Sequence, residues 1–135
     1  MSHGQIADDE VLYRRIPPGK SWFQPPDRIS SFNFKLRSDE LGVSVYRAAA
    51  LTVQEVLKKP EAIPGSGVAV ATAGQIRALQ NGKGDLLKLE VVPVNDENDP
   101  GHAEIHGPNP GVISSSAANA LRTLFNLVEP PSMSS

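Results

Sequence analysis

The sequence contains no cysteine, and this absence removes two classes of protein at once. A chain without cysteine has neither a disulfide framework nor a thiolate that acts as nucleophile or metal ligand. Residues 1–5 also lack the basic and then apolar order of a secretion signal. Together these absences predict a cytoplasmic location.

Long hydrophobic runs are absent as well. A helix that crosses a bilayer needs ~20 consecutive apolar residues. The longest mainly apolar strand candidate here, residues 86–94, is interrupted by Lys88 and Glu90. We therefore expect no membrane partner.

Neither sign of charge is in excess. The chain has 13 Lys and Arg against 15 Asp and Glu, for a net charge of −2. Duplex nucleic acid is bound by clustered basic residues, which are missing, so no such partner is expected. The only local concentration of positive charge is Arg14, Arg15 and Lys20, with Arg28 further along. That group is sufficient for one phosphate.

What is present suits one domain. The chain has 135 residues, of which 39% are hydrophobic, enough for a buried core. The polar start predicts a flexible tail over residues 1–10, and Pro130-Pro131 predicts another over 129–135. Residues 11–128 are then a single domain.

Apolar and polar residues alternate in several segments, which is the pattern of half-buried strands. Strands are expected at 11–16, 29–35, 41–46, 68–71, 86–94 and 102–106. Thr52 with Glu55 and Thr72 with Gln75 form two capping boxes, and each predicts the start of a helix. Ser114 or Ser115 caps a third helix, whose apolar face runs from Ala117 to Val128.

The order of these elements indicates the fold class. The first three strands have no helix between them, which predicts an N-terminal antiparallel meander. Helices alternate with strands in the second half. We expect an α+β domain of about six strands and three helices.

One strand carries a candidate metal site. Residues alternate between the two faces of a strand, so His102, Glu104 and His106 share one face and Ala103 and Ile105 the other. Two imidazoles and a carboxylate form a known open ligand set for iron or zinc. The alternative is a polar outer face over a buried Ile105. No fingerprint of an organic cofactor is present, so none is predicted.

A second candidate site binds an anion. Arg28 clamps a phosphate or nucleotide in this hypothesis, while Ser30 and Ser31 donate hydrogen bonds and Arg14 or Arg15 adds a second guanidinium. His102 then acts as general acid or base. In the alternative, Arg28 pairs with Asp27 or Asp39, and the serines line a narrow edge.

The only tryptophan lies in a stiff loop between two Pro-Pro pairs, residues 17–26. Trp22 and Phe23 either fold back onto the core or form a surface that contacts a ligand or a protein partner. Both interpretations stay open.

Several short motifs resemble those of a family of uncharacterised small bacterial proteins. They are Arg28-x-Ser30-Ser31 followed by Phe34, Ser44-Val45-Tyr46, and Pro100-x-His102-Ala103-x-Ile105. The resemblance implies bacterial origin and a shared fold, with no known activity. It leaves Glu104 and His106 outside the pattern.

A thinner resemblance is to the Arg-Ser-Glu arrangement of ADP-ribosyltransferases. There Arg14, Ser30 or Ser31, and Glu104 would hold and activate NAD. Only about 15 residues separate Arg14 from Ser30, too few for the helix that usually lies between them.

Two functions follow from these observations. The first is a protein-interaction module that uses the Trp22 loop. The second is an enzyme or small-molecule binder with Arg28, Ser30, Ser31 and His102 around a phosphate or nucleotide. The sequence leaves open whether the protein is an enzyme.

Overall fold

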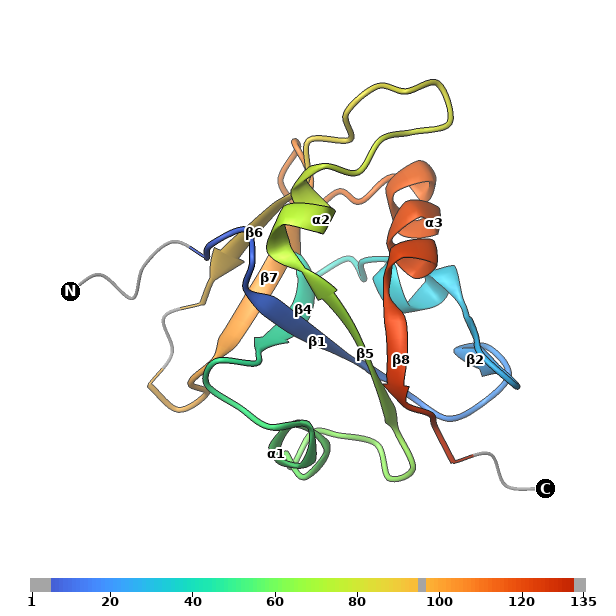
Figure 1. Ribbon diagram of the computed structural model, residues 1–135, viewed down its shortest axis with the longest axis vertical. Coiled ribbons are helices and arrows are strands. Elements are labelled where there is room, and N and C mark those ends of the chain that lie inside the picture. The colour runs from blue at the N-terminus through green and yellow to red at the C-terminus, as the bar shows by residue number, and fades with distance from the viewer. Residues whose placement is uncertain (1–5, 95–96, 133–135) are drawn as a thin grey trace.

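The computed structural model describes residues 6–94 and 97–132, which form a six-stranded antiparallel sheet with helices on both faces (Figure 1). The strand order is β6-β7-β4-β1-β5-β8. The strands are β1 (Val11–Ile16), β4 (Val43–Arg47), β5 (Gly67–Thr72), β6 (Glu90–Pro93), β7 (His102–His106) and β8 (Asn126–Glu129).

Three helices and two small elements complete the fold. The helices are α1 (Val53–Leu57), α2 (Ala73–Arg77) and α3 (Ser115–Leu124). The small elements are a separate hairpin of β2 (Phe23–Gln24) with β3 (Arg28–Ile29), and a 3-10 helix η1 (Ser31–Phe34). The predicted α+β class is confirmed.

Alternation along the central strand separates two cores. Leu12 and Ile16 of β1 are fully buried in the main core. Tyr13 lies on the other face and pairs across the sheet with Tyr46 of β4. Side chains of successive strand residues point to opposite faces, so one strand supports both cores.

The main core lies between the sheet and a layer made of α3, η1 and the hairpin. Leu121 and Phe125 of the α3 segment are buried there, and the Phe125 ring lies 5.1 Å from that of Phe34 in η1. The smaller core contains Val56 of α1 with Tyr46 and Val68. Helix α3 therefore fixes η1 and the hairpin against the sheet.

The predicted helix starts are confirmed. Thr52 and Thr72 each accept a hydrogen bond from the backbone N–H of the third helical residue, and the side-chain oxygens of Glu55 and Gln75 accept one from the backbone N–H of the cap. Ser114 caps α3 in the same way, through the backbone N–H of Ala117. These caps satisfy backbone donors that a helix otherwise leaves free.

The prediction of a strand over 29–35 is wrong. The strand ends at Ile29, and the chain turns into η1 because local side chains hold its backbone. Ser30 Oγ accepts from the N–H of Phe32 at 3.1 Å, and Asn33 Nδ2 donates to the carbonyl of Ser30 at 2.9 Å. Such bonds compete with pairing in a sheet.

Two other boundaries differ from prediction. The helix expected to continue to Val128 ends at Leu124, because Phe125 takes an extended conformation and the chain continues as edge strand β8. The strand expected from 86 begins only at Glu90, since Lys88 has a left-handed φ of 57°. A left-handed residue interrupts the alternation of a strand.

Parts of the two expected tails pack on the domain. Ile6 is buried, and the carbonyl of Asp8 accepts from the N–H of Gly74. Pro131 is buried, and the N–H of Ser132 donates to Gly65. Residues 1–5 and 133–135 of these tails lie outside the described residues. Within the described residues, no helix is long and apolar enough to cross a membrane.

Candidate functional site

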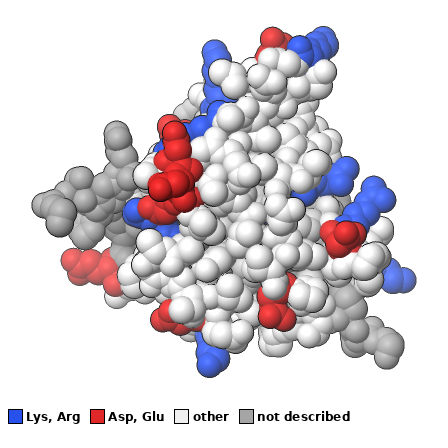
Figure 2. Space-filling view, viewed as in Figure 1, with Lys and Arg blue, Asp and Glu red and all other residues white. Residues whose placement is uncertain are grey.

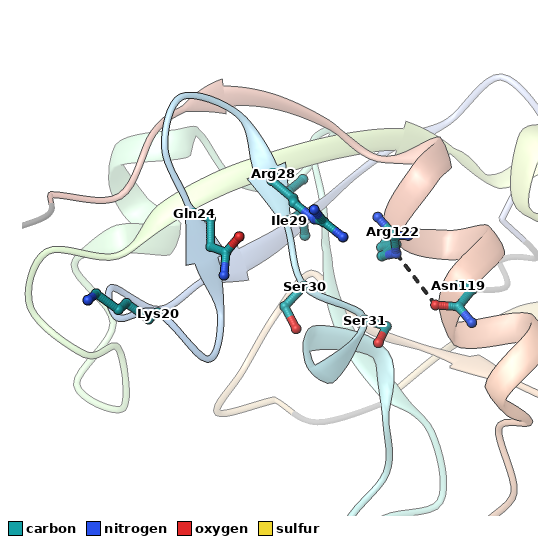
Figure 3. A pocket seen from close by; sticks show the side chains of 8 residues that line it. All are labelled: Lys20, Gln24, Arg28, Ile29, Ser30, Ser31, Asn119 and Arg122. Atoms are coloured by element: carbon teal, nitrogen blue, oxygen red, sulfur yellow. Dashed lines mark hydrogen bonds between the residues drawn. The ribbon is translucent and has the colours of Figure 1, made fainter.

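A hollow of about 380 Å³ opens between the hairpin, η1 and α3 (Figure 3). Buried Ile29 contributes the apolar part of its lining, and most of the rest is polar or basic. The residues that line it are Lys20, Gln24, Arg28, Ile29, Ser30, Ser31, Asn119 and Arg122. We call this hollow the basic pocket.

The basic pocket holds three cations and no carboxylate. Among the described residues, Lys20 and Arg28 have no hydrogen-bond or ion-pair partner, whereas Arg122 has a single long contact, 3.5 Å from Nε to Asn119 Oδ1. Figure 3 shows the side chain of Arg28 extending toward Arg122, which lies across the hollow on α3. Like charges so placed repel one another, and an anion between them removes the repulsion.

Ser30 and Ser31 complete the pocket with hydroxyl donors. Both are half-buried and line the hollow beside Arg28. The oxygen of Ser30 already accepts a bond from Phe32, but its O–H remains able to donate. The structure thus brings together three of the predicted anion-binding residues.

Buried residues of the hairpin and η1 hold the pocket wall in place. Phe23 and Ile29 are buried partners across the hairpin. Asn33 is fully buried, and its Nδ2 also donates to the carbonyl of Trp22 at 2.9 Å. Its side-chain Oδ1 has no partner among the described residues. This single amide group ties η1 to the loop that carries Trp22.

Arg14, predicted to add a second guanidinium, is half-buried beside η1 and does not line the pocket. Its Nε donates to the carbonyl of Asn33 and its Nη1 to that of Ser44, both at 2.9 Å. Burial lowers the pKa of Arg14 to about 10, and nearby Glu40 opposes the shift. The role of Arg14 is to position η1 against the sheet.

His102, predicted as acid or base beside Arg28, also does not line the pocket. It lies on β7, on the face of the sheet that carries α1. Its ring stacks on Tyr46 with centroids 5.5 Å apart, and its Nε2 lies 3.1 Å from Ser44 Oγ. The α3 layer occupies the opposite face, so the sheet separates His102 from Arg28.

Ser44, His102 and Asp99 follow one another in the sequence of groups found in a catalytic triad, but their distances do not match one. The carboxylate Oδ2 of Asp99 lies 3.7 Å from His102 Nδ1, which is beyond a hydrogen bond. The same carboxylate is paired with Lys59, whose positive charge competes for it. These contacts orient the imidazole and the Ser44 hydroxyl, and they do not form a Ser-His-Asp triad.

The predicted metal site is not formed. His102, Glu104 and His106 do share one face, as expected, but His106 Nε2 bonds to Glu104 Oε1 at 2.9 Å while His102 turns to Ser44. Alternate residues on a strand are ~6.5–7 Å apart, too far for all three to meet at one ion without a bulge. Within residues 6–94 and 97–132, no three ligating side chains converge.

The Arg-Ser-Glu arrangement is also not assembled. Arg14 is committed to backbone carbonyls in the interior, and Glu104 is paired with His106 across from Ser44. Ser30 lies in the basic pocket with neither of them. Nothing in this geometry resembles a site for NAD.

Trp22 is half-buried, and its ring meets that of Phe32 edge-on with centroids 6.4 Å apart. Phe32 is half exposed, and the ammonium of Lys35 lies 5.0 Å from its ring centre. Trp22 therefore belongs to the outer wall of the hairpin layer. Its use as a contact surface stays a prediction.

Sequence reasoning missed Gln24 and both pocket residues that lie on α3. Asn119 and Arg122 are three residues apart on the expected helix, on the side opposite its apolar stripe. Polar residues are common on the exposed face of a helix, so the sequence does not distinguish these two as site residues. Only their position beside Arg28 in the structure does so. That position depends on the packing of α3 against η1.

When the chain is compared with models of known protein families, with curated proteins and with solved structures, no match is found. The resemblance to small bacterial proteins stays a prediction. The geometry of the basic pocket therefore carries the functional argument.

Proposed function

We propose that this protein is a binding module that recognises an oxyanion, a phosphate or carboxylate group of its ligand, in the basic pocket. The observation that carries the proposal is the pair of cations without partners, Lys20 and Arg28, beside the weakly engaged Arg122. Guanidinium groups bind carboxylate and phosphate with two parallel hydrogen bonds, which gives both affinity and orientation.

The surroundings favour a ligand over a structural ion pair. Asp27 is next to Arg28 in sequence, yet no bond joins them among the described residues, and neither does Arg28 pair with Asp39. A cation that a fold uses structurally has such a partner, as Arg77 has in Asp8 at 2.7 Å. The proposal covers binding and includes no reaction, and it retains the cytoplasmic location expected from the sequence.

The test is calorimetric titration with pyrophosphate at low salt. Arg28→Ala and Arg122→Ala should each weaken binding about tenfold or more, because each removes a charge-assisted pair of bonds. Arg37→Ala is the matched control, since Arg37 is an exposed cation outside the pocket. Equal affinity in all three variants, or none in the parent protein, overturns the proposal.

A further inference from the structure

The basic pocket continues into a second hollow of about 570 Å³. The two share Arg28, Ile29 and Arg122, so together they form one groove along the hairpin. The second hollow is lined by Asp27, Arg28, Ile29, Arg122, Thr123, Phe125, Asn126 and Leu127. We call the combined feature the β3–β8 groove.

Two strand edges border this groove. β8 is the last strand of the six-stranded sheet and pairs only with β5. β3 pairs only with β2. The terminal strands of two separate sheets thus lie on either side of one hollow, with backbone groups that no neighbouring strand uses. Such edges are templates for pairing with another chain.

The floor and rim differ in character. Ile29 and Phe125, both nearly inaccessible, and half-buried Leu127 supply the apolar part of the groove floor, and most of the accessible lining is polar. Three cations stand along it, Lys20, Arg28 and Arg122, against the single carboxylate of Asp27. In Figure 2, blue side chains gather on the right-hand side, where Figure 1 places β2 and the end of α3 near β8.

We propose that the groove binds an extended acidic peptide, which adds as a strand to β8 and places a carboxylate between Arg28 and Arg122. This inference rests on the proposed function and names its ligand class. Main-chain hydrogen bonds to a sheet edge supply affinity, while alternate side chains of the peptide reach the floor and the cations. Pro130 follows β8 and limits the paired segment to about four residues.

The charge of the groove selects this occupant. A second copy of the chain would offer its own β8, Asn126–Glu129, with one carboxylate for three cations. A free phosphate would fill the basic pocket and leave the apolar floor and both edges uncovered. An acidic strand satisfies all three features together.

The test uses a fluorescein-labelled peptide of eight residues that alternates valine and glutamate, measured by fluorescence anisotropy. Arg28→Ala should weaken its binding about tenfold. Asn126→Asp, which adds a negative charge to the groove, should weaken it as well, and Arg37→Ala should not. A peptide with lysine in place of glutamate should not bind, and equal binding of that peptide overturns the charge selection.

Backbone pairing is tested with two further peptides, N-methylated at every valine or at every glutamate. At least one should bind tenfold or more weakly, because a methylated nitrogen cannot donate to a strand edge. If both bind as tightly as the unmodified peptide, strand addition is overturned.

Two outcomes separate this inference from the proposed function. If pyrophosphate binds through Arg28 but the acidic peptide does not bind, the peptide inference fails and the anion pocket stands. If neither binds, both fail. A rise in molecular mass on gel filtration, lost in Asn126→Asp, would identify a second copy as the occupant and overturn the peptide.

Discussion

Arg14 is a half-buried cation whose side-chain hydrogen bonds are made to backbone carbonyls. It joins η1 to β4, because one guanidinium spans the carbonyls of Asn33 and Ser44. A side chain that replaces it without donors leaves two interior acceptors unpaired, and this cost exceeds that of a lost surface bond. The desolvation that lowers the pKa of Arg14 also offsets part of the stability that its two hydrogen bonds provide.

We expect Arg14→Met to lower the free energy of unfolding by about 1–3 kcal/mol, the net of lost hydrogen bonds and relieved desolvation. Urea unfolding measures it. Arg37→Met is the control, because Arg37 is exposed, and its effect should stay within about 0.5 kcal/mol. Equal urea midpoints for the two variants would show that Arg14 does not have this structural role.

Tyr46 should make the free energy of unfolding decrease at high pH. Burial raises the pKa of Tyr46 to about 12, and nearby Arg15 acts in the opposite direction. An unfolded tyrosine ionises near pH ~10. Between these values the unfolded chain has lost a proton that the native chain keeps, so stability falls as pH rises from about 10 toward 12.

The Tyr46→Phe variant should lack this decline. The comparison is made by urea unfolding of both proteins at pH 9, 10 and 11. Arg14, whose pKa is lowered, makes stability rise with pH above about 10 in both proteins, because burial is the largest cause of its shift and Tyr46 is one of the smaller ones. Parallel pH profiles for parent and variant would contradict the prediction.

At the scale of elements, β8 depends on a glycine in its neighbour. A Cβ added at Gly67 of β5 would lie 2.2 Å from the carbonyl oxygen of Glu129 and 2.5 Å from the nitrogen of Pro131. These are backbone atoms, which no side-chain rotation can move away. The close approach of the two strands therefore requires the absence of a side chain at this position.

Gly67→Ala should destabilise the protein by about 1–3 kcal/mol through this overlap. Gly82→Ala provides the matched control, because nothing lies within 4 Å of the added Cβ there. Thermal unfolding of the two variants gives the comparison. Similar melting temperatures would mean that β8 is not held against β5 as described.

Helix starts marked by a capping box were predictable, whereas a 3-10 turn without one and a strand that depends on a distant partner were not. The capping boxes at Thr52 and Thr72 fix their helices within a few residues, so the sequence predicts both. Residues 29–35 alternate like a strand, but Ser30 and Asn33 bond to their own neighbourhood and produce η1 instead. The edge strand β8 needs β5 beside it, which no local pattern shows.

At the scale of the whole molecule, the hairpin layer and the sheet should unfold together. Phe23, Ile29 and Phe34 of that layer are part of the main core. Small domains with one continuous core unfold in a single transition. Trp22 reports on the layer through its fluorescence, and far-ultraviolet circular dichroism reports on the sheet.

The two signals should follow one urea transition with the same midpoint. A fluorescence change at lower urea would show that the hairpin layer opens on its own. In that case the basic pocket would belong to a less stable unit that unfolds before the rest of the core.

The candidate site could be predicted only in part for a related reason. Arg28, Ser30 and Ser31 are close in sequence and stay together in the pocket. Arg122 comes from the other end of the chain, and only the contact of α3 with η1 brings it near. His102 shares a strand face with its predicted neighbours, but its actual partner Ser44 lies on β4.

The central position of β1 has a consequence for synthesis of the chain. β1 leaves the ribosome before its partners β4 and β5, which end only at Arg47 and Thr72. The core that covers it also waits for α3, near the C-terminus. Long-range pairing of this kind slows folding and exposes unpaired edges in the meantime. The nascent chain therefore carries β1 as an open strand until these later segments have been made, the period in which a chaperone would protect it.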